Sequence, residues 1–340
     1  MKPHTIPQPS WLSAYLYYSE PWESFLCQAV APFVEQIKLR QLAEEFFFIR
    51  YWEKGPHIRL RFKGNIRDLE KYVKPALIAH FTAYFSAHPS SRTQPPWLSQ
   101  VPEAQQWLAN NSIQWVAYEP ETERYGGEAG LFIAEKQFQA SSEAVLSILL
   151  ESRTWEYNLA LGAAIQLHLG FAFAACMNLP EARLFFSKVF ENWLPRACIS
   201  YGQNISTEER QAQENEVLQA FNRTYQKQKK VLLPFFQRIW TALESQAEFE
   251  QVWFNTWVYQ MKGICTELQQ IQNRGQLTIP AAYVIHPQAF ISRQQRQLWV
   301  IYDSYVHMTN NRLGILNHDE GFLGYLIKQI LEEMALETKT

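Results

Sequence analysis

Residues 46–63 read FFFIRYWEKGPHIRLRFK, and this stretch decides the fold of the first part of the chain. Two runs rich in aromatic and apolar residues, 46–52 and 57–63, flank Glu53-Lys54-Gly55-Pro56, and this pattern predicts a β-hairpin. Because alternate side chains of a strand point to opposite faces, the second strand would have one apolar and one cationic face. The apolar set is Ile58, Leu60 and Phe62, and the other set is His57, Arg59, Arg61 and Lys63.

The segments around this hairpin alternate between strand and helix patterns. Strands are predicted over 12–18 and 113–118, and helices over 21–38 and 66–87. The order strand-helix-strand-strand-helix-strand is that of a ferredoxin-like split βαβ sheet. After residue 141 helical patterns dominate, over 142–152, 155–178, 180–193, 207–245, 247–272, 291–313 and 321–337, with a polar connection over 273–290. We therefore expect an α+β protein in which residues 1–150 form the sheet region and residues 151–340 form a mainly α-helical region, packed as one compact unit.

The composition limits the classes of function. The 340 residues are 47 % hydrophobic and 15 % aromatic, and the net charge is −2. This charge argues against a general nucleic-acid surface, which would need a net basic face. The aromatic residues suit a core and also a cleft for peptides or flat ligands.

The cysteines and the N-terminus indicate the compartment. No Cys-x-x-Cys pair occurs among Cys27, Cys176, Cys198 and Cys265, so neither a zinc site nor a redox motif is indicated. The N-terminal residues lack the apolar core of a signal peptide. We expect reduced thiols in a cytoplasmic protein.

One segment imitates a membrane span. Residues 159–179, LALGAAIQLHLGFAFAACMNL, carry no charge. Gln166 and His168 lie near the middle of this segment, and the chain offers no second span. These features favour a buried central helix, and we expect no membrane span.

The first candidate cluster is His57, Arg59 and Arg61. Arginine binds carboxylates in bidentate fashion and stays cationic at all relevant pH. Two arginines on one strand face, about 7 Å apart, could grip an anionic group. The alternative is a solvent-exposed outer face of the sheet.

The second candidate cluster lies in residues 118–127, which read YEPETERYGG. The glycine pair suggests a tight turn or a close backbone approach. Glu121 and Arg124 could pair with each other, or either could face a ligand. The alternative is a surface salt bridge before a turn.

The third candidate cluster lies in residues 300–313, which read VIYDSYVHMTNNRL. On a helix, Ser304, His307 and Asn311 would share one stripe. His307 is the best general acid or base candidate because imidazole titrates near neutrality. The alternative is a structural histidine. The chain has no Gly-rich phosphate loop, no G-x-S-x-G and no metal-spaced His/Asp set.

The identity and order of these three strings carry more information than each string alone. FFIRYWEKGPHIRLRF resembles the first motif of the C-terminal domain of class I lantibiotic dehydratases, also called the thiopeptide-type bacteriocin biosynthesis domain. YEPETERYGG resembles the second motif of this domain, and HMTNNRLG at 307–314 resembles the last. With Trp11 and the strand that follows it, the resemblance runs from about residue 11 to residue 337.

The resemblance implies an activity. This domain eliminates glutamate from glutamylated Ser or Thr of a ribosomally made precursor peptide, which leaves dehydroalanine or dehydrobutyrine. In full-length members it follows a large glutamylation domain, for which this chain has no room. We therefore expect a stand-alone elimination lyase that needs no metal or cofactor. Its expected partners are the precursor peptide and a separate tRNA-dependent glutamylation protein, and no direct contact with nucleic acid is expected.

The resemblance also implies the site residues. The expected catalytic residues are Arg59, Arg61, Glu121, Arg124 and His307, and the expected substrate-binding residues are His57, Tyr125, Asn311 and Arg312. Two other functions stay open. Relatives of this domain include pyridine synthases, which join two dehydroalanines in a formal [4+2] cycloaddition, and a non-catalytic peptide-binding scaffold would also use the aromatic residues. The sequence leaves the oligomeric state, including a homodimer, open.

Overall fold

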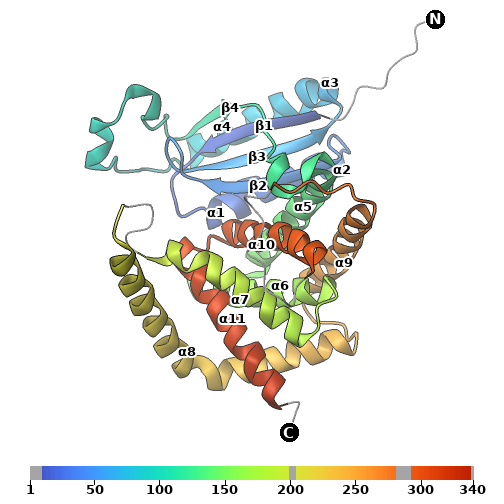
Figure 1. Cartoon of the computed structure of the whole chain (residues 1–340). Helices are drawn as coiled ribbons and strands as arrows, with labels where there is room; N and C mark the ends of the chain where they lie inside the picture. Colours follow the sequence, from blue (N-terminus) through green and yellow to red (C-terminus); the bar gives the residue numbers. More distant parts are fainter. Residues whose placement is uncertain (1–9, 199–203, 281–291, 338–340) are drawn as a thin grey trace, which may run out of the picture. The chain divides into compact units, whose positions relative to one another are not determined.

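The computed structural model describes residues 10–198, 204–280 and 292–337 (Figure 1). The chain divides into two compact units. Unit 1 comprises Met1–Glu121 and Phe138–Trp155, and unit 2 comprises Thr122–Gln137 and Glu156–Thr340. The expected boundary near residue 150, and the packing of both regions as one compact unit, stay predictions.

Unit 1 is built on a four-stranded antiparallel sheet. Its strands are β1 (Ser10–Tyr17), β2 (Glu45–Tyr51), β3 (His57–Gly64) and β4 (Ser112–Trp115), in the spatial order β2-β3-β1-β4 (Figure 1). β2 and β3 form the predicted hairpin, and β3 also pairs with β1 so that Arg61 lies opposite Ser13. Helical segments connect β1 to β2 and β3 to β4. This is the predicted ferredoxin-like order, and the α+β fold class is confirmed.

Two helical segments pack on the apolar face of β3. The first is α1 (Glu23–Phe25), the π-helical η1 (Leu26–Val30) and α2 (Ala31–Leu39); the second is α3 (Ile66–Asp68), the π-helical η2 (Leu69–Val73) and α4 (Lys74–Ala87). In each segment a proline, Pro32 or Pro75, follows the π-helical turn. Proline lacks the N–H that a regular ladder would use there. The ring of Phe62 packs edge-on against Phe33 at 5.7 Å, and this contact joins β3 to α2.

The cationic face of β3 is covered as well. The strand register places His57, Arg59 and Arg61 on the face opposite Phe62, so the predicted division into two faces is confirmed. His57 is fully buried and Arg61 is only 5 % exposed. The alternative of a solvent-exposed outer face is therefore wrong. Aromatic rings of the same unit, described below, pack over these side chains.

Helix α5 (Gly127–Glu151) begins earlier than the sequence indicated. Gly126 and Gly127 have φ angles of 88° and 86°, and they end the short 3₁₀ turn η5 (Thr122–Tyr125). Residues 128–141 contain no proline and place Leu131, Ala134 and Phe138 at helical spacing. The expected start near residue 142 therefore missed the first half of this helix.

The part of α5 that belongs to unit 1 closes one edge of the sheet. β2 is an edge strand, and its outward N–H groups at Phe46 and Phe48 donate to Gln139 Oε1 at 3.3 Å and to Ser142 Oγ at 3.2 Å. Free strand edges invite pairing with other chains. The side chains of α5 satisfy this edge within the unit.

Unit 2 is mainly helical, as predicted. Its further elements are α6 (Tyr157–Ala174), α7 (Leu179–Trp193), η6 (Pro195–Ala197), α8 (Thr207–Glu244), α9 (Val252–Asn273), α10 (Arg293–Leu313) and α11 (Asn317–Glu337). α7 and α11 pack side by side (Figure 1), and Gly324 lets α11 approach the backbone of Phe190. Gly314 ends α10 with a left-handed φ of 81°, which turns the chain into α11. The predicted connection over 273–290 lies largely outside the described residues.

Helix α6 is the one described helix that is long and apolar enough to cross a membrane. In the structure 61 % of it is buried. His168, near its middle, is hydrogen-bonded to Asn310 of α10 at 2.8 Å. α6 thus lies inside unit 2, as the expected buried helix would.

The closed edge of β2 can be tested with Ser142→Ala. This variant removes the acceptor of the buried Phe48 N–H, and an unsatisfied buried donor costs about 1–3 kcal/mol. We expect the free energy of unfolding, measured in urea, to fall by about this amount. Ser86→Ala is the control, because Ser86 is exposed and bonds the carbonyl of Thr82 in its own helix. An equal loss in both variants would contradict the assigned role of Ser142.

Candidate functional site

The structure groups the predicted site residues into two clusters, one in each unit. The arginine cluster of unit 1 consists of His57, Arg59 and Arg61 on β3 with the rings around them. The histidine cluster of unit 2 consists of His307 with Glu320, Asn310 and His168. Each cluster is held by hydrogen bonds within its own unit.

Arg59 lies between two tyrosine rings and a carboxylate. Its guanidinium carbon is 3.4 Å from the ring centre of Tyr51 and 4.5 Å from that of Tyr15. Its Nη2 is 3.2 Å from Oε2 of Glu53, which is 64 % exposed. The rings hold the cation from its faces. The guanidinium edge is thus already engaged with a carboxylate.

His57 fixes the orientation of Arg59. The Nδ1–H of His57 donates to the carbonyl of Gly55 at 2.8 Å, and Nε2 accepts from Nε of Arg59 at 3.3 Å. Burial lowers the pKa of His57 to about 4, and the nearby charges of Arg59 and Arg61 act in the same direction. The imidazole is therefore neutral at pH 7, which is the state that can accept a hydrogen bond from a guanidinium.

Arg61 is the more deeply buried of the two arginines in the cluster. Its Nε donates to Ser13 Oγ at 3.3 Å, and its guanidinium lies 4.5 Å from the ring centre of Tyr118 and 5.2 Å from that of Phe47. Burial lowers the pKa of Arg61 from its ordinary value, but a guanidinium stays charged. Arg61 therefore adds a fixed positive charge beneath the sheet surface.

The turn around Gly126 sets the position of Arg124. The carbonyl of Gly126 accepts a hydrogen bond from the N–H of Thr278 at 2.9 Å. Arg124 Nε donates to Ser304 Oγ of α10 at 2.9 Å, which ties the turn to the predicted helix stripe. Arg124 thereby contacts the stripe of α10 on which the sequence placed Ser304 and His307.

His307 is paired with a buried carboxylate. Its Nδ1 lies 3.0 Å from Oε1 and 3.1 Å from Oε2 of Glu320, in the first turn of α11. The side chain of His307 is 22 % exposed, whereas that of Glu320 is 2 % exposed. The ring of His307 stacks on Trp193 at 4.6 Å. In the neutral tautomer whose Nδ1–H donates to this carboxylate, Nε2 carries the lone pair, as in a catalytic imidazole oriented by an acid.

Further residues extend this pairing into the interior of unit 2. Asn310 Nδ2 donates to Glu320 Oε2 at 3.2 Å, and Asn310 Oδ1 accepts from Nε2 of His168 at 2.8 Å. Burial raises the pKa of Glu320, while the neighbouring His307 opposes this shift. Burial lowers the pKa of His168 to about 4. A neutral His168 therefore orients Asn310, and Asn310 orients the carboxylate.

Asp303 is a second acidic group in this cluster. Burial raises its pKa to about 6, and the charges of His307 and Arg124 oppose this shift. A carboxyl that titrates near pH 6 can hold or release a proton close to neutrality. Asp303 is thus a candidate acid beside His307.

The other predicted site residues differ in exposure. Tyr125 and Arg312 are buried, at 3 % and 0 %, and Arg312 donates to the carbonyl of Met308 at 2.8 Å. Asn311 is half-buried on α10, and Glu121 is exposed at the end of the first segment of unit 1. Their predicted roles, like those of the clusters, stay predictions.

Sequence reasoning missed Glu320, Asn310, Asp303 and His168 as parts of the site. Asp303 and Asn310 lie within the quoted stretch 300–313, at i−4 and i+3 from His307, so helical spacing alone could have found them. Glu320 is on the next helix and no periodicity links it to His307. Within the described ranges, no group of three or more His, Cys, Asp and Glu side chains is placed to hold a metal ion.

Solved structures that share this fold include the following three. The "pyridine synthase, TbtD, from thiomuracin biosynthesis" matches with a TM-score of 0.73 and 19 % identity, over 95 % of this chain and 98 % of that chain. TsrL matches with a TM-score of 0.66 and 17 % identity, over 96 % and 95 %. The tRNA-dependent lantibiotic dehydratase MibB from Microbispora sp. 107891 matches with a TM-score of 0.58 and 19 % identity, over 96 % of this chain and 28 % of MibB. At these identities the likeness shows the fold alone.

The family of the chain follows from comparison of its sequence. Residues 11–331 match the family described as "Lantibiotic biosynthesis dehydratase C-term", and the chain belongs to this family. The subtilin biosynthesis protein SpaB of Bacillus subtilis is 32 % identical over 141 residues, which are 41 % of this chain and 12 % of SpaB. The resemblance drawn from the three motifs is confirmed.

The glycine-dependent turn before α5 can be tested with Gly130→Ala. A Cβ at this position would collide with the carbonyl oxygen of Tyr125, which is backbone and cannot swing away. We expect the free energy of unfolding in urea to fall by about 1–3 kcal/mol. In Gly162→Ala, the control within α6, the new Cβ meets nothing within 4 Å, and the variant should be neutral or about 1 kcal/mol more stable. Equal behaviour of the two variants would refute the close approach at Gly130.

The buried His168 predicts a pH dependence of stability. Its pKa is about 4 in the folded state and about 6.5 when unfolded, so between pH 7 and pH 4 only the unfolded chain gains the proton. Folding stability is therefore lost as the pH falls through this window, by about 3 kcal/mol from this residue. His168→Gln keeps a donor for Asn310 without titrating.

The measurement is urea unfolding at pH 7, 5.5 and 4.5. We expect the stability of His168→Gln to fall less on acidification than that of the parent. His318→Gln is the control, because the side chain of His318 is 56 % exposed, and this variant should follow the parent. If His168→Gln also followed the parent, a neutral buried His168 would be excluded.

Proposed function

We propose that this chain eliminates glutamate from glutamylated Ser or Thr of a precursor peptide and so forms dehydroalanine or dehydrobutyrine. The observation that carries the proposal is the pairing of His307 with Glu320. This pairing gives the partly exposed imidazole one nitrogen that is fixed as donor and another that can accept a proton. The three family motifs supply the remaining groups that such an elimination requires.

The reaction needs a base and a stabilised leaving group. In the proposed step, Nε2 of His307 takes the Cα proton of the esterified residue, and the C–H electron pair becomes the Cα=Cβ bond. The Cβ–O bond breaks with its electron pair, so glutamate leaves as a carboxylate. The proton passes from His307 to water. Negative charge develops on the Cα carbonyl and on the departing oxygens, and fixed cations stabilise it.

The arginine cluster suits the carboxylate groups of the leaving glutamate. Arg59 already donates to the carboxylate of Glu53, and an exposed pair of this kind is held weakly. A carboxylate of the substrate could therefore replace Glu53 without a loss of buried contacts. We assign Arg59 to this binding, His57 to its orientation, and Arg61 to the supporting positive charge.

The remaining predicted residues receive roles in the same reaction. Arg124, held by Ser304, is assigned to the developing negative charge, and Glu121 or Asp303 to proton transfer. Tyr125, Asn311 and Arg312 are assigned to substrate positioning. As partners we assign the precursor peptide and a tRNA-dependent protein that makes the glutamyl ester.

The test uses a synthetic peptide that carries a glutamyl ester on serine, followed by mass spectrometry. We expect loss of glutamate and formation of dehydroalanine. Replacing a general base lowers the rate on the order of 10²–10⁴-fold, so His307→Ala should lower kcat by at least about 100-fold. Arg59→Ala should raise KM and lower kcat, because Arg59 would bind the leaving group.

Two control variants sharpen the assignment. His318→Ala removes an exposed histidine near Glu320 along the chain and should keep full activity. Glu320→Gln should lower kcat on the order of 10-fold or more with little change in KM, because Glu320 acts through His307. A peptide that binds without losing glutamate would overturn the proposal and favour a peptide-binding scaffold. Variants in either cluster should impair the same reaction.

A second candidate function is a pyridine synthase. The match to TbtD over 98 % of its length favours it, since MibB is matched over only 28 %. Such an enzyme would convert a peptide with two dehydroalanines into a cyclic product without any glutamyl ester. Cyclisation of such a peptide, with no glutamate release from the ester peptide, would support this function over elimination.

A further inference from the structure

Strand β4 presents an open edge in unit 1. The N–H of Val116 bonds the carbonyl of Ser13, so the pairing register with β1 directs the N–H and C=O groups of Ile113 and Trp115 outward. These groups have no hydrogen-bond partner among the described residues. The other edge of the same sheet, at Phe46 and Phe48, is capped by side chains of α5. The unit therefore closes one edge and leaves the other available.

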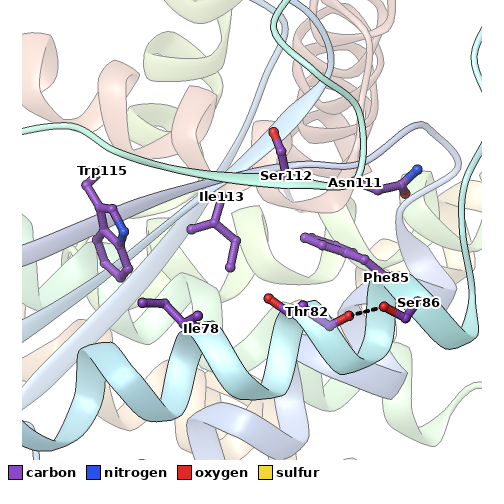
Figure 2. Close-up of a pocket in the computed structure, with 8 residues that line it drawn as sticks. All are labelled: Ile78, Thr82, Phe85, Ser86, Asn111, Ser112, Ile113 and Trp115. Carbon is purple, nitrogen blue, oxygen red and sulfur yellow. Dashed lines mark hydrogen bonds between the residues drawn. The ribbon is translucent and has the colours of Figure 1, made fainter.

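A pocket lies beside this open edge. It has a volume of about 450 Å³ and lies between β4 and helix α4 (Figure 2). Figure 2 shows Ile113 and Trp115 pointing toward α4, where Ile78 and Phe85 face them. Ile78 is 43 % exposed, so apolar surface is left for a ligand. None of the described residues that line the pocket is charged, and this favours a neutral group over an ion. Four of them are apolar or aromatic and four carry a hydroxyl or amide group, so the pocket suits an apolar side chain beside a polar backbone.

The two features point to one kind of ligand. Outward donors and acceptors at every second residue match the backbone of an extended chain, and the pocket lies on the side to which Ile113 and Trp115 point. A strand opposite them would send its own alternate side chains to that side. An apolar small molecule would fill the pocket but would leave the backbone groups unused.

We propose that β4 binds an extended segment of the peptide substrate by antiparallel strand addition, with alternate apolar side chains of that segment in the pocket between β4 and α4. The antiparallel sense is that of every other pair in the sheet. The identification of the ligand as substrate rests on the proposed function. In this proposal the groove holds the peptide backbone, and its lining contains none of the residues assigned to the chemistry.

The test measures the anisotropy of a fluorescein-labelled peptide, acetyl-Thr-Val-Thr-Leu-Thr-Val-Thr-amide, titrated with the full chain. In the proposed geometry the Val and Leu N–H groups face β4 and the Thr N–H groups face away. N-methylation at Val and Leu should weaken binding at least tenfold, whereas N-methylation at Thr should change it less than threefold. Equal binding of both methylated peptides, or no binding of the parent peptide, would overturn the proposal.

Two variants of the protein locate the binding. Thr82→Glu puts a charge into the pocket and should weaken binding at least tenfold. Ala83→Glu adds the same charge to the next residue of α4, which is exposed and lies outside the pocket, and should bind like the parent. If Thr82→Glu bound as tightly as Ala83→Glu, the peptide would lie elsewhere and the proposal would fail.

A separate measurement distinguishes failure of docking from failure of the proposed function. A glutamylated tripeptide lacks the extended segment that β4 is proposed to bind, so its turnover should be the same in Thr82→Glu and in the parent. Loss of its turnover in Thr82→Glu would overturn a docking role that is independent of the chemistry. Absence of turnover in the parent, with the expected binding pattern intact, would refute the elimination activity and leave β4 as a peptide-binding edge.

Discussion

The carboxylate of Glu320 is buried, and the need to satisfy it organises the helices of unit 2. A carboxylate removed from water requires hydrogen-bond donors, and here His307 and Asn310 of α10 provide them. The first turn of α11, where Glu320 lies, also favours negative charge because the helix dipole is positive there. The left-handed Gly314 brings the two helices together over a short connection. Removing the carboxylate would leave the donors of α10 unsatisfied, so the geometry of the imidazole and the packing of the helices depend on the same contact.

Unit 1 also contains a buried charge that must be stabilised, and here the charge is positive. Arg61 is surrounded by the faces of Phe47 and Tyr118, which stabilise a cation without supplying a counter-charge. Arg59 receives similar support from Tyr15 and Tyr51, but its side chain keeps 15 % exposure and a carboxylate partner. Buried Arg61 is therefore a fixed positive charge, whereas the more exposed Arg59 can exchange its carboxylate partner. His57 is neutral beside them: the charges of both arginines disfavour a protonated imidazole, and the neutral ring accepts from Arg59.

The fold of unit 1 could be predicted because it depends on local patterns. The alternation in 57–63 assigns each side chain to a face, and the hairpin and two helices then fix the strand order. What covers the cationic face could not be predicted. Tyr118 is the last residue of the predicted strand 113–118 but lies beyond β4, and no local pattern places its ring over Arg61. The same holds for His307 and Glu320, which lie on different helices. The sequence predicted His307 as the residue for proton transfer, but its pairing with the carboxylate of Glu320 depends on the turn at Gly314, which no local pattern shows. The early start of α5 was missed for a different reason, because the glycine pair was interpreted as a turn and the helix begins within it.

The shared fold does not decide between the chemistries of its relatives, since one matching structure is a pyridine synthase and another a lantibiotic dehydratase. The difference between the two reactions lies in the leaving group. Elimination of glutamate expels a carboxylate, whereas the joining of two dehydroalanines does not begin with that step. A guanidinium that already holds an exposed carboxylate, as Arg59 holds Glu53, has a direct use only in the first reaction. His307 with Glu320 would serve a proton transfer in either case. The pairing is the basis for assigning proton-transfer chemistry to the chain, and the arginine cluster adds the reason to prefer elimination within that chemistry.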